Sequence, residues 1–126
     1  MALSRAILNA LEKILSMSNR SDDLLVLDII ESIEAIFIYT KGVTEEAFIA
    51  NREKSDAVIR NIEVIGEAAG NLSLSFQEQH PEIPWHQIIG MRNRLIHGYF
   101  GISLKIIWQV VTVDLPVLHQ QIAALR

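Results

Sequence analysis

The sequence predicts an all-α fold, arranged as an up-and-down helical bundle. Apolar residues recur at helical spacing through most of the 126 residues, and no segment shows sustained strand-like alternation. Capping and turn residues divide these apolar runs into lengths that are typical of helices. The chain has no repeats, low-complexity tracts or linkers, so we expect one domain built around one core.

The first half of the chain predicts three helices. One helix spans residues 3–17, and the turn and N-cap residues of 18–22 separate it from a second helix over 22–40. The second helix stops at Lys41-Gly42, because glycine accepts the left-handed conformation of a helix C-cap. A short helix over 44–50 follows, with a threonine as its cap.

Residues 52–72 predict the third long helix. Its apolar stripe repeats at helical spacing, and the charged residues Arg60, Glu63 and Glu67 lie outside that stripe. Near its end is a patch of small residues where another helix can approach closely: Gly66, Ala68, Ala69 and Gly70.

The remaining helices are bounded by capping residues and prolines. A short capped helix runs over 73–80, and Pro84 suits the first position of a helix over 85–99. The last helix begins at Ser103 and continues to the C-terminus, and we expect Pro116 to bend it.

The composition is rich in apolar residues for so small a chain. Half of the residues are hydrophobic, and the mean hydropathy is positive. We therefore expect a homodimer, or a higher oligomer, whose interface covers the excess. No apolar stretch reaches the ~18 residues that a membrane-spanning helix needs, so no membrane role is expected.

Charge and cysteine content narrow the class of protein further. The chain has no cysteine and no apolar signal core at its N-terminus, which favours a cytoplasmic location. Its net charge is -4, whereas a protein that coats nucleic acid without specificity is usually basic. Any contact with RNA must therefore be local, or must use a surface that two subunits build together.

The helix over 85–99 carries an arginine where an apolar residue is expected. With Trp85 at 0° and about 100° per residue, Arg92 falls at about 340°, in the middle of the apolar stripe. Arg94 points the opposite way, whereas Asn93 and His97 share one flank. Breaks of this kind tend to occur at functional sites. The alternative is an arginine that reaches out to water, or pairs with a carboxylate, along the helix edge.

Arg92 and His97 supply the groups that RNA cleavage requires. Histidine takes and gives protons near neutral pH, and the arginine fork matches phosphate oxygens. RNA brings its own 2′-hydroxyl nucleophile, so this chemistry needs no metal or cofactor. Residues five apart diverge by about 140° around a helix. A groove between two symmetry-related copies of this helix would let one subunit's arginine face the other's histidine.

The other polar and aromatic candidates have ordinary explanations. His80, His86 and His119 fit surface or capping roles, although His86 could line the same groove. No HExxH motif, Cys/His cluster or carboxylate cage indicates a metal site. Trp85 and Trp108 lie in apolar registers and are expected in the core.

The motif and its surroundings resemble a known family. Arg92-Asn93, then His97 and Tyr99, is similar to the arginine-x4-histidine-x-tyrosine signature of HEPN-domain ribonucleases. Two longer blocks, 56–69 and 80–101, resemble the HepT branch, and the likeness covers about Asp22 to Leu125. Outside that pattern, residues 1–16 form an extension helix or mark an alternative start, and residues 17–126 form the HEPN domain.

The resemblance implies a function and a role for each motif residue. It implies an all-α HEPN homodimer that cleaves RNA, tRNA or mRNA, without metal, as the toxin of a toxin–antitoxin pair. Arg92 would stabilise the phosphate, His97 would act as acid and base, and Asn93 would support them. The antitoxin of such pairs, the minimal nucleotidyltransferase MntA, is thought to silence the toxin by attaching AMP to the tyrosine, here Tyr99.

Two alternatives stay open from the sequence. The bundle could be a non-catalytic partner and modification acceptor of the nucleotidyltransferase, with a groove that binds RNA or nucleotide without cutting it. It could also be a structural helical dimer in which Arg92 makes an interface salt bridge. The acidic net charge favours the first of these slightly.

Overall fold

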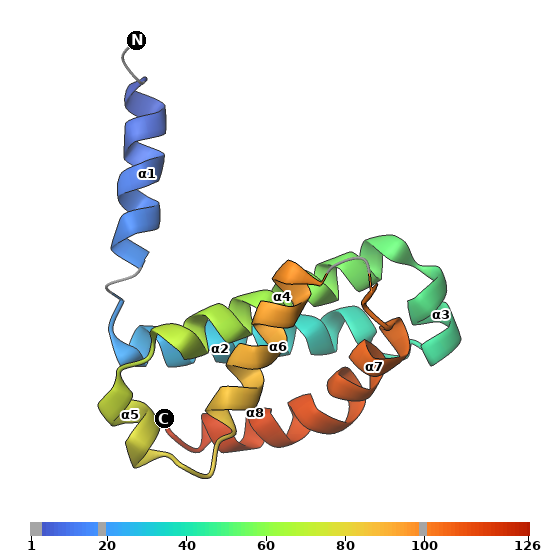
Figure 1. The fold of residues 1–126 in the computed structure, drawn as a ribbon. Coiled ribbons are helices and arrows are strands. Elements are labelled where there is room, and N and C mark those ends of the chain that lie inside the picture. Colours follow the sequence, from blue (N-terminus) through green and yellow to red (C-terminus); the bar gives the residue numbers. More distant parts are fainter. Residues whose placement is uncertain (1–3, 18–19, 99–100) are drawn as a thin grey trace.

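The computed structural model describes residues 4–17, 20–98 and 101–126, and within these ranges the chain forms helices and no strand. The all-α prediction is therefore confirmed (Figure 1). The elements are α1 (Arg5–Met17), α2 (Asp22–Thr40), α3 (Glu45–Ala50), α4 (Arg52–Asn71), α5 (Leu74–Gln79), α6 (Trp85–His97), α7 (Leu104–Gln109), the π-helical segment η2 (Val110–Asp114) and α8 (Leu115–Ala123).

The long helices α2 and α4 form the base of the domain. They lie side by side, and the short α3 turns the chain between them (Figure 1). α6 crosses α4, while α8 packs against α2. The largest fully buried side chains come from five segments of the chain: Phe48, Ile29, Ile33, Ile36, Ile83, Ile122 and Val58. Burial of each of these side chains contributes about 1.5–3 kcal/mol to the stability of the fold. This core holds α4 in place, and α6 packs against α4.

Side-chain caps set the helix starts where the sequence predicts them. Ser21, Thr44 and Ser73 each accept a hydrogen bond from the backbone N–H three residues later, at 3.1 to 3.3 Å. Gly42 has a φ of +70°, as expected of a glycine that ends α2 in the left-handed region. The predicted bounds of the second helix are confirmed at both ends.

Several predicted helix boundaries differ from the structure by one or two residues. The first described helix begins at Arg5, because Ser4 is not helical; the predicted start at residue 3 lies outside the described residues. Pro84 is the N-cap of α6 and not its first helical residue, because its ψ of 69° lies outside the helical region. α6 ends at His97, two residues early, because Gly98 takes the C-cap position and donates its N–H to the Arg94 carbonyl at 2.7 Å.

The predicted last helix changes its winding before Pro116. In η2 the hydrogen bonds skip an extra residue, so the N–H of Leu115 donates to the carbonyl of Val110, five residues earlier. A proline in an α-helix would clash with the carbonyl four residues before it and has no N–H to donate. The wider turn removes that conflict, and Pro116 then lies in the first turn of α8.

α1 extends away from the rest of the domain (Figure 1). One side of it is apolar, and these side chains are exposed: Ile7, Leu8, Leu11 and Ile14. Among the helices that the structure describes, none is long and apolar enough to cross a membrane.

Candidate functional site

The candidate site is built on α6, which Gly66 allows to lie unusually close to α4. A Cβ added at Gly66 would overlap the Cβ of Arg92, and it would lie 2.9 Å from the Arg92 Cγ and 3.1 Å from the Ile88 carbonyl oxygen. The predicted small-residue patch is therefore confirmed at Gly66, and its partner is the motif helix. A glycine at this position places the base of the Arg92 side chain directly on α4.

Arg92 is held at the α4–α6 crossing by two polar partners. Its Nη2 forms an ion pair with the Oε2 of Glu67 at 2.6 Å, and its Nη1 donates to the Oδ1 of Asn93 at 3.0 Å. The third guanidinium nitrogen, Nε, is buried without a hydrogen-bond partner in the described part of the chain. Because Nε is buried, it is closed to an acceptor from outside, whereas the Arg92 side chain as a whole is about one-third exposed.

The groove beside Arg92 alternates cations with carboxylates. It has a volume of about 360 Å³ and receives two more arginines, each paired with an acid: Arg20 with Asp28 at 3.0 Å, and Arg60 with Glu63 at 3.6 Å. Its lining thus carries as many carboxylates as arginines. A polyanion would enter this groove only by competing with the carboxylates for the guanidinium groups.

His97 opens into a different hollow from Arg92. This second hollow, of about 640 Å³, is lined by Asn93, Arg94, His97 and residues of the chain from Gly101 to Ile107, and Arg92 does not line it. The divergence expected for residues five apart is therefore observed. Asn93 links the two sides, since it lines the His97 hollow and accepts the hydrogen bond from Arg92.

The other predicted site residue, Tyr99, lies outside the described residues. Of the remaining histidines, His80 lies 3.7 Å from Glu82 and His119 lies 3.5 Å from Glu34. His86 is exposed. The described residues contain no group of three or more histidines and acidic residues that could hold a metal ion.

The tryptophans have the structural roles predicted from their registers. Trp85 is buried, and its Nε1 donates to the carbonyl of His80 at 3.0 Å. Trp108 is half-buried, with its ring centroid 5.1 Å from that of Phe48. Both rings pack against aromatic side chains of the fold.

Glu67 is the site residue that the sequence analysis missed. It was placed outside the apolar stripe of its helix, and its side chain is indeed about half exposed. Its contact with Arg92 depends on the close approach at Gly66, the neighbouring residue. A carboxylate beside a small-residue patch was the available signal, because the partner helix must cross at that patch.

Comparison with known proteins places the chain in one family. The family model described as "Ribonuclease HepT-like" matches residues 29–125. A protein of Thermococcus cleftensis named "Probable ribonuclease HepT" is 41% identical over 99 residues, which cover 79% of this chain and 90% of that protein. A Methanocaldococcus jannaschii protein named as a "Putative RNase" is 38% identical over 106 residues, covering 84% and 97%.

The same family sequence also occurs within a longer protein. A Methanocaldococcus jannaschii protein named "Gamma-glutamylcyclotransferase and putative RNase" is 48% identical over 94 residues, covering 75% of this chain but 42% of that protein. No solved structure matches the chain at a significant level of similarity.

Proposed function

Because the chain belongs to the HepT-like ribonuclease family, we propose that it cleaves RNA internally without a metal ion, with His97 and Arg92 as its catalytic residues. The observation that carries this proposal is the state of Arg92. Its guanidinium is fixed at the helix crossing by Glu67 and Asn93, and its side chain is partly exposed. A cation held in this way is prepared for a phosphate oxygen.

The chemistry follows from the two side chains and the RNA itself. Neutral His97 takes the proton of the 2′-hydroxyl, whose oxygen attacks the adjacent phosphorus. Arg92 stabilises the extra negative charge on the phosphorane. The imidazolium then returns its proton to the departing 5′-oxygen. The products are one strand that ends in a 2′,3′-cyclic phosphate and one that begins with a 5′-hydroxyl.

We place this reaction in a homodimer. Within one chain, Arg92 and His97 open into separate hollows. Two α6 helices related by a two-fold axis would bring the arginine of one subunit to the histidine of the other. Asn93, which contacts Arg92 and borders the His97 hollow, would position both groups.

The biological setting that we propose comes from the resemblance to the HepT branch. The chain would be the cytoplasmic toxin of a toxin–antitoxin pair, and its substrate tRNA or mRNA. Its partner would be a minimal nucleotidyltransferase that attaches AMP to Tyr99. Intact mass measurement after co-expression with such a partner, compared with Tyr99→Phe, tests this step.

A cleavage assay tests the proposed chemistry. Purified protein is incubated with total tRNA and with mRNA in EDTA, beside Arg92→Ala and His97→Ala. Arg52→Ala and His119→Ala are matched controls, because Arg52 is largely exposed on α4 and His119 lies on α8, where it lines neither the Arg92 groove nor the His97 hollow. We expect cleavage that survives chelation, persists in the controls and disappears in both motif variants. Undiminished cleavage by either motif variant would contradict the proposal.

A second candidate is a non-catalytic acceptor subunit for the nucleotidyltransferase. The ion pair between Arg92 and Glu67 and the net charge of -4 favour it, because both weaken affinity for RNA. This candidate predicts modification of Tyr99 without any RNA cleavage by the unmodified protein. The cleavage assay, with intact mass confirming an unmodified chain, separates the two.

A further inference from the structure

Arg94 also lines the His97 hollow, and the proposed mechanism assigns it no role. Arg94 and His97 are three residues apart on α6, so their Cβ atoms lie about 5–6 Å from each other on one side of the helix. Both line the same hollow, whereas Arg92 does not line it. Within one chain, the arginine that shares a hollow with His97 is therefore Arg94.

The two arginines of α6 differ in their partners. Arg92 is about one-third exposed and is bound by Glu67 and Asn93. Arg94 is exposed, and its guanidinium has no hydrogen bond or ion pair within the described part of the chain. An anion that binds Arg94 therefore displaces only water, whereas an anion that binds Arg92 competes with a carboxylate.

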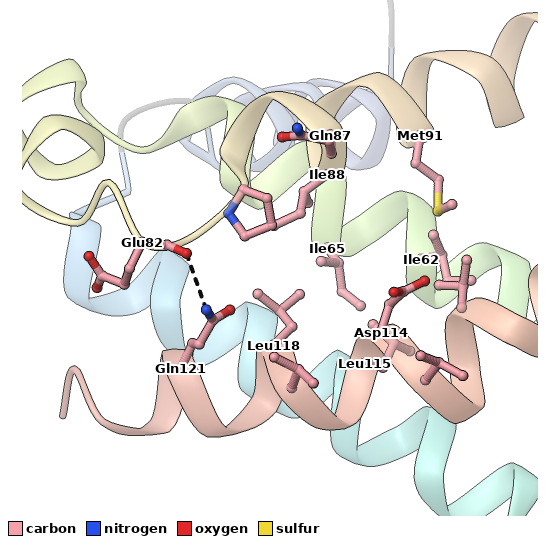
Figure 2. Close-up of a pocket in the computed structure, with 14 residues that line it drawn as sticks. Ile62, Ile65, Glu82, Gln87, Ile88, Met91, Asp114, Leu115, Leu118 and Gln121 are labelled. Atoms are coloured by element: carbon pink, nitrogen blue, oxygen red, sulfur yellow. Dashed lines mark hydrogen bonds between the residues drawn. The ribbon is translucent and has the colours of Figure 1, made fainter.

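The hollows that border α6 also differ in charge. The groove beside Arg92 carries as many carboxylates as arginines. Another groove, of about 590 Å³ between α6 and α8, is lined among the described residues by the acids Glu82 and Asp114 and by no basic residue (Figure 2). No acidic residue is among the described residues that line the His97 hollow. Of these three, the His97 hollow is the one whose charge attracts a polyanion.

The sequence around this hollow is locally basic. Residues 83–113 contain no aspartate or glutamate, although the whole chain has a net charge of -4. The same stretch holds Arg92, Arg94 and Lys105. A basic surface on an acidic protein fits the local contact with RNA that the sequence predicts.

The position of the hollow at the end of α6 makes a cation important. The last carbonyl groups of a helix carry partial negative charge, which repels a phosphate. Arg94 and His97 are the basic residues of this last turn, and an arginine is always charged. Arg94 offsets the repulsion, and its planar fork of donors matches two oxygens of a phosphodiester.

We propose that Arg94 binds the backbone of the RNA substrate in the His97 hollow and holds it beside His97 of the same chain. Its guanidinium donates to non-bridging oxygens of the phosphodiester backbone, and Arg92 keeps its proposed role at the reacting phosphorus. This inference rests on the proposed function, because RNA is the ligand. Binding alone tests it, without cleavage.

An RNA that cannot be cleaved is the probe for this role. It is single-stranded, labelled with fluorescein, and carries a 2′-O-methyl group on every nucleotide, which removes the nucleophile. Fluorescence anisotropy over a range of salt concentrations measures its affinity for the wild-type chain, Arg94→Gln and Arg52→Gln, each unmodified by intact mass. Arg52→Gln is the matched control, because it removes the same charge from an arginine that is 86% exposed on α4 and does not line the hollow.

We expect Arg94→Gln to bind the probe about tenfold more weakly than the wild-type chain at low salt, because one phosphate contact is lost. The slope of log K against log salt concentration should become shallower by about 0.7. Arg52→Gln should leave both quantities nearly unchanged. Arg94→Lys should keep the slope and lose part of the affinity, because lysine retains the charge but not the fork.

The fold and the kinetics of the same variants separate binding from other roles. Because the Arg94 guanidinium has no partner in the described part of the chain, Arg94→Gln should fold as the wild-type chain does, which circular dichroism checks. With cleavable RNA, its KM should rise about tenfold while kcat changes little. A fall in kcat at an unchanged KM would overturn the binding role.

Three binding results would also overturn the inference. One is equal affinity and equal salt slope for Arg94→Gln and the wild-type chain, even if the chain cleaves RNA. Another is an equal loss in Arg94→Gln and Arg52→Gln, which would show only a long-range effect of charge. The third is a wild-type chain that does not bind the probe. By contrast, a specific loss in Arg94→Gln of a chain that cleaves no RNA would support the inference and contradict the proposed function.

Discussion

The two sides of α6 differ in how firmly the domain holds them. On the Arg92 side, α6 rests on Gly66 and the guanidinium is bound by Glu67 and Asn93. On the other side, His97 is exposed and borders an open hollow. A phosphate-binding cation gains from a fixed position, whereas a proton carrier must reach its substrate. For the proposed function, the contrast means that the Arg92 half of the site is held within the chain, whereas the His97 half is completed by what binds it.

The largest expected effect is on RNA cleavage, and it comes from substituting His97, on the exposed side of α6. In the proposed mechanism His97 moves the protons, so we expect RNA cleavage by His97→Ala to fall by about 10²- to 10⁴-fold. Because His97 is exposed, the free energy of unfolding should change by less than about 0.5 kcal/mol. Cleavage rates and urea unfolding measure the two quantities. A large loss of stability would show that His97 also supports the fold and that the two sides of α6 do not differ in this respect.

On the Arg92 side of α6, we expect substitutions to act mainly by lowering the free energy of unfolding. In Gly66→Ala the new Cβ meets the Arg92 side chain and the Ile88 carbonyl, so α6 must shift. We expect a loss of about 1–3 kcal/mol in the free energy of unfolding, together with reduced cleavage.

Gly70→Ala is the matched control for this substitution. Its added Cβ would lie 3.9 Å from the Ile89 Cγ1, an ordinary contact. The gain in helix propensity should stabilise the chain by about 0.5–1 kcal/mol. Equal effects of the two alanines would contradict the close crossing at Gly66.

A smaller effect is expected when the ion pair is broken. Glu67→Gln should lower the free energy of unfolding by less than about 1 kcal/mol, because both side chains are partly exposed. The same change frees Arg92 from a competing carboxylate, so RNA should bind more tightly. Fluorescence anisotropy with labelled RNA measures the change, and Glu53→Gln, elsewhere on α4, removes the same charge as a control. Unchanged affinity in Glu67→Gln would show that Glu67 does not compete with phosphate.

The helices were largely predictable because their determinants are local. Ser21, Thr44 and Ser73 cap helices as their side-chain chemistry requires, and Gly42 ends α2 with a positive φ. The boundary errors at the two ends of α6 arose where glycine and proline act through backbone geometry. Gly98 ends α6 early. Before Pro116 the last helix contains a π-helical segment, where the sequence predicted a simple bend.

The candidate site was predictable only in part, because its contacts join distant segments. The position of Arg92 within an apolar stripe is readable from spacing. Its partner Glu67 lies 25 residues earlier, and their contact depends on how α4 and α6 cross. The separation of Arg92 and His97 into two hollows follows from helix geometry. The residues that line those hollows do not, because they come from other helices.

Complementation between two inactive chains tests the two-subunit site most directly. Arg92→Ala and His97→Ala chains with different tags are co-expressed, and heterodimers are isolated by sequential affinity steps. If each site takes its arginine from one subunit and its histidine from the other, every heterodimer retains one intact site. RNA cleavage should then return to about half of the wild-type level per dimer. Heterodimers as inactive as either parent would show that both residues must come from the same chain, and would contradict the composite site.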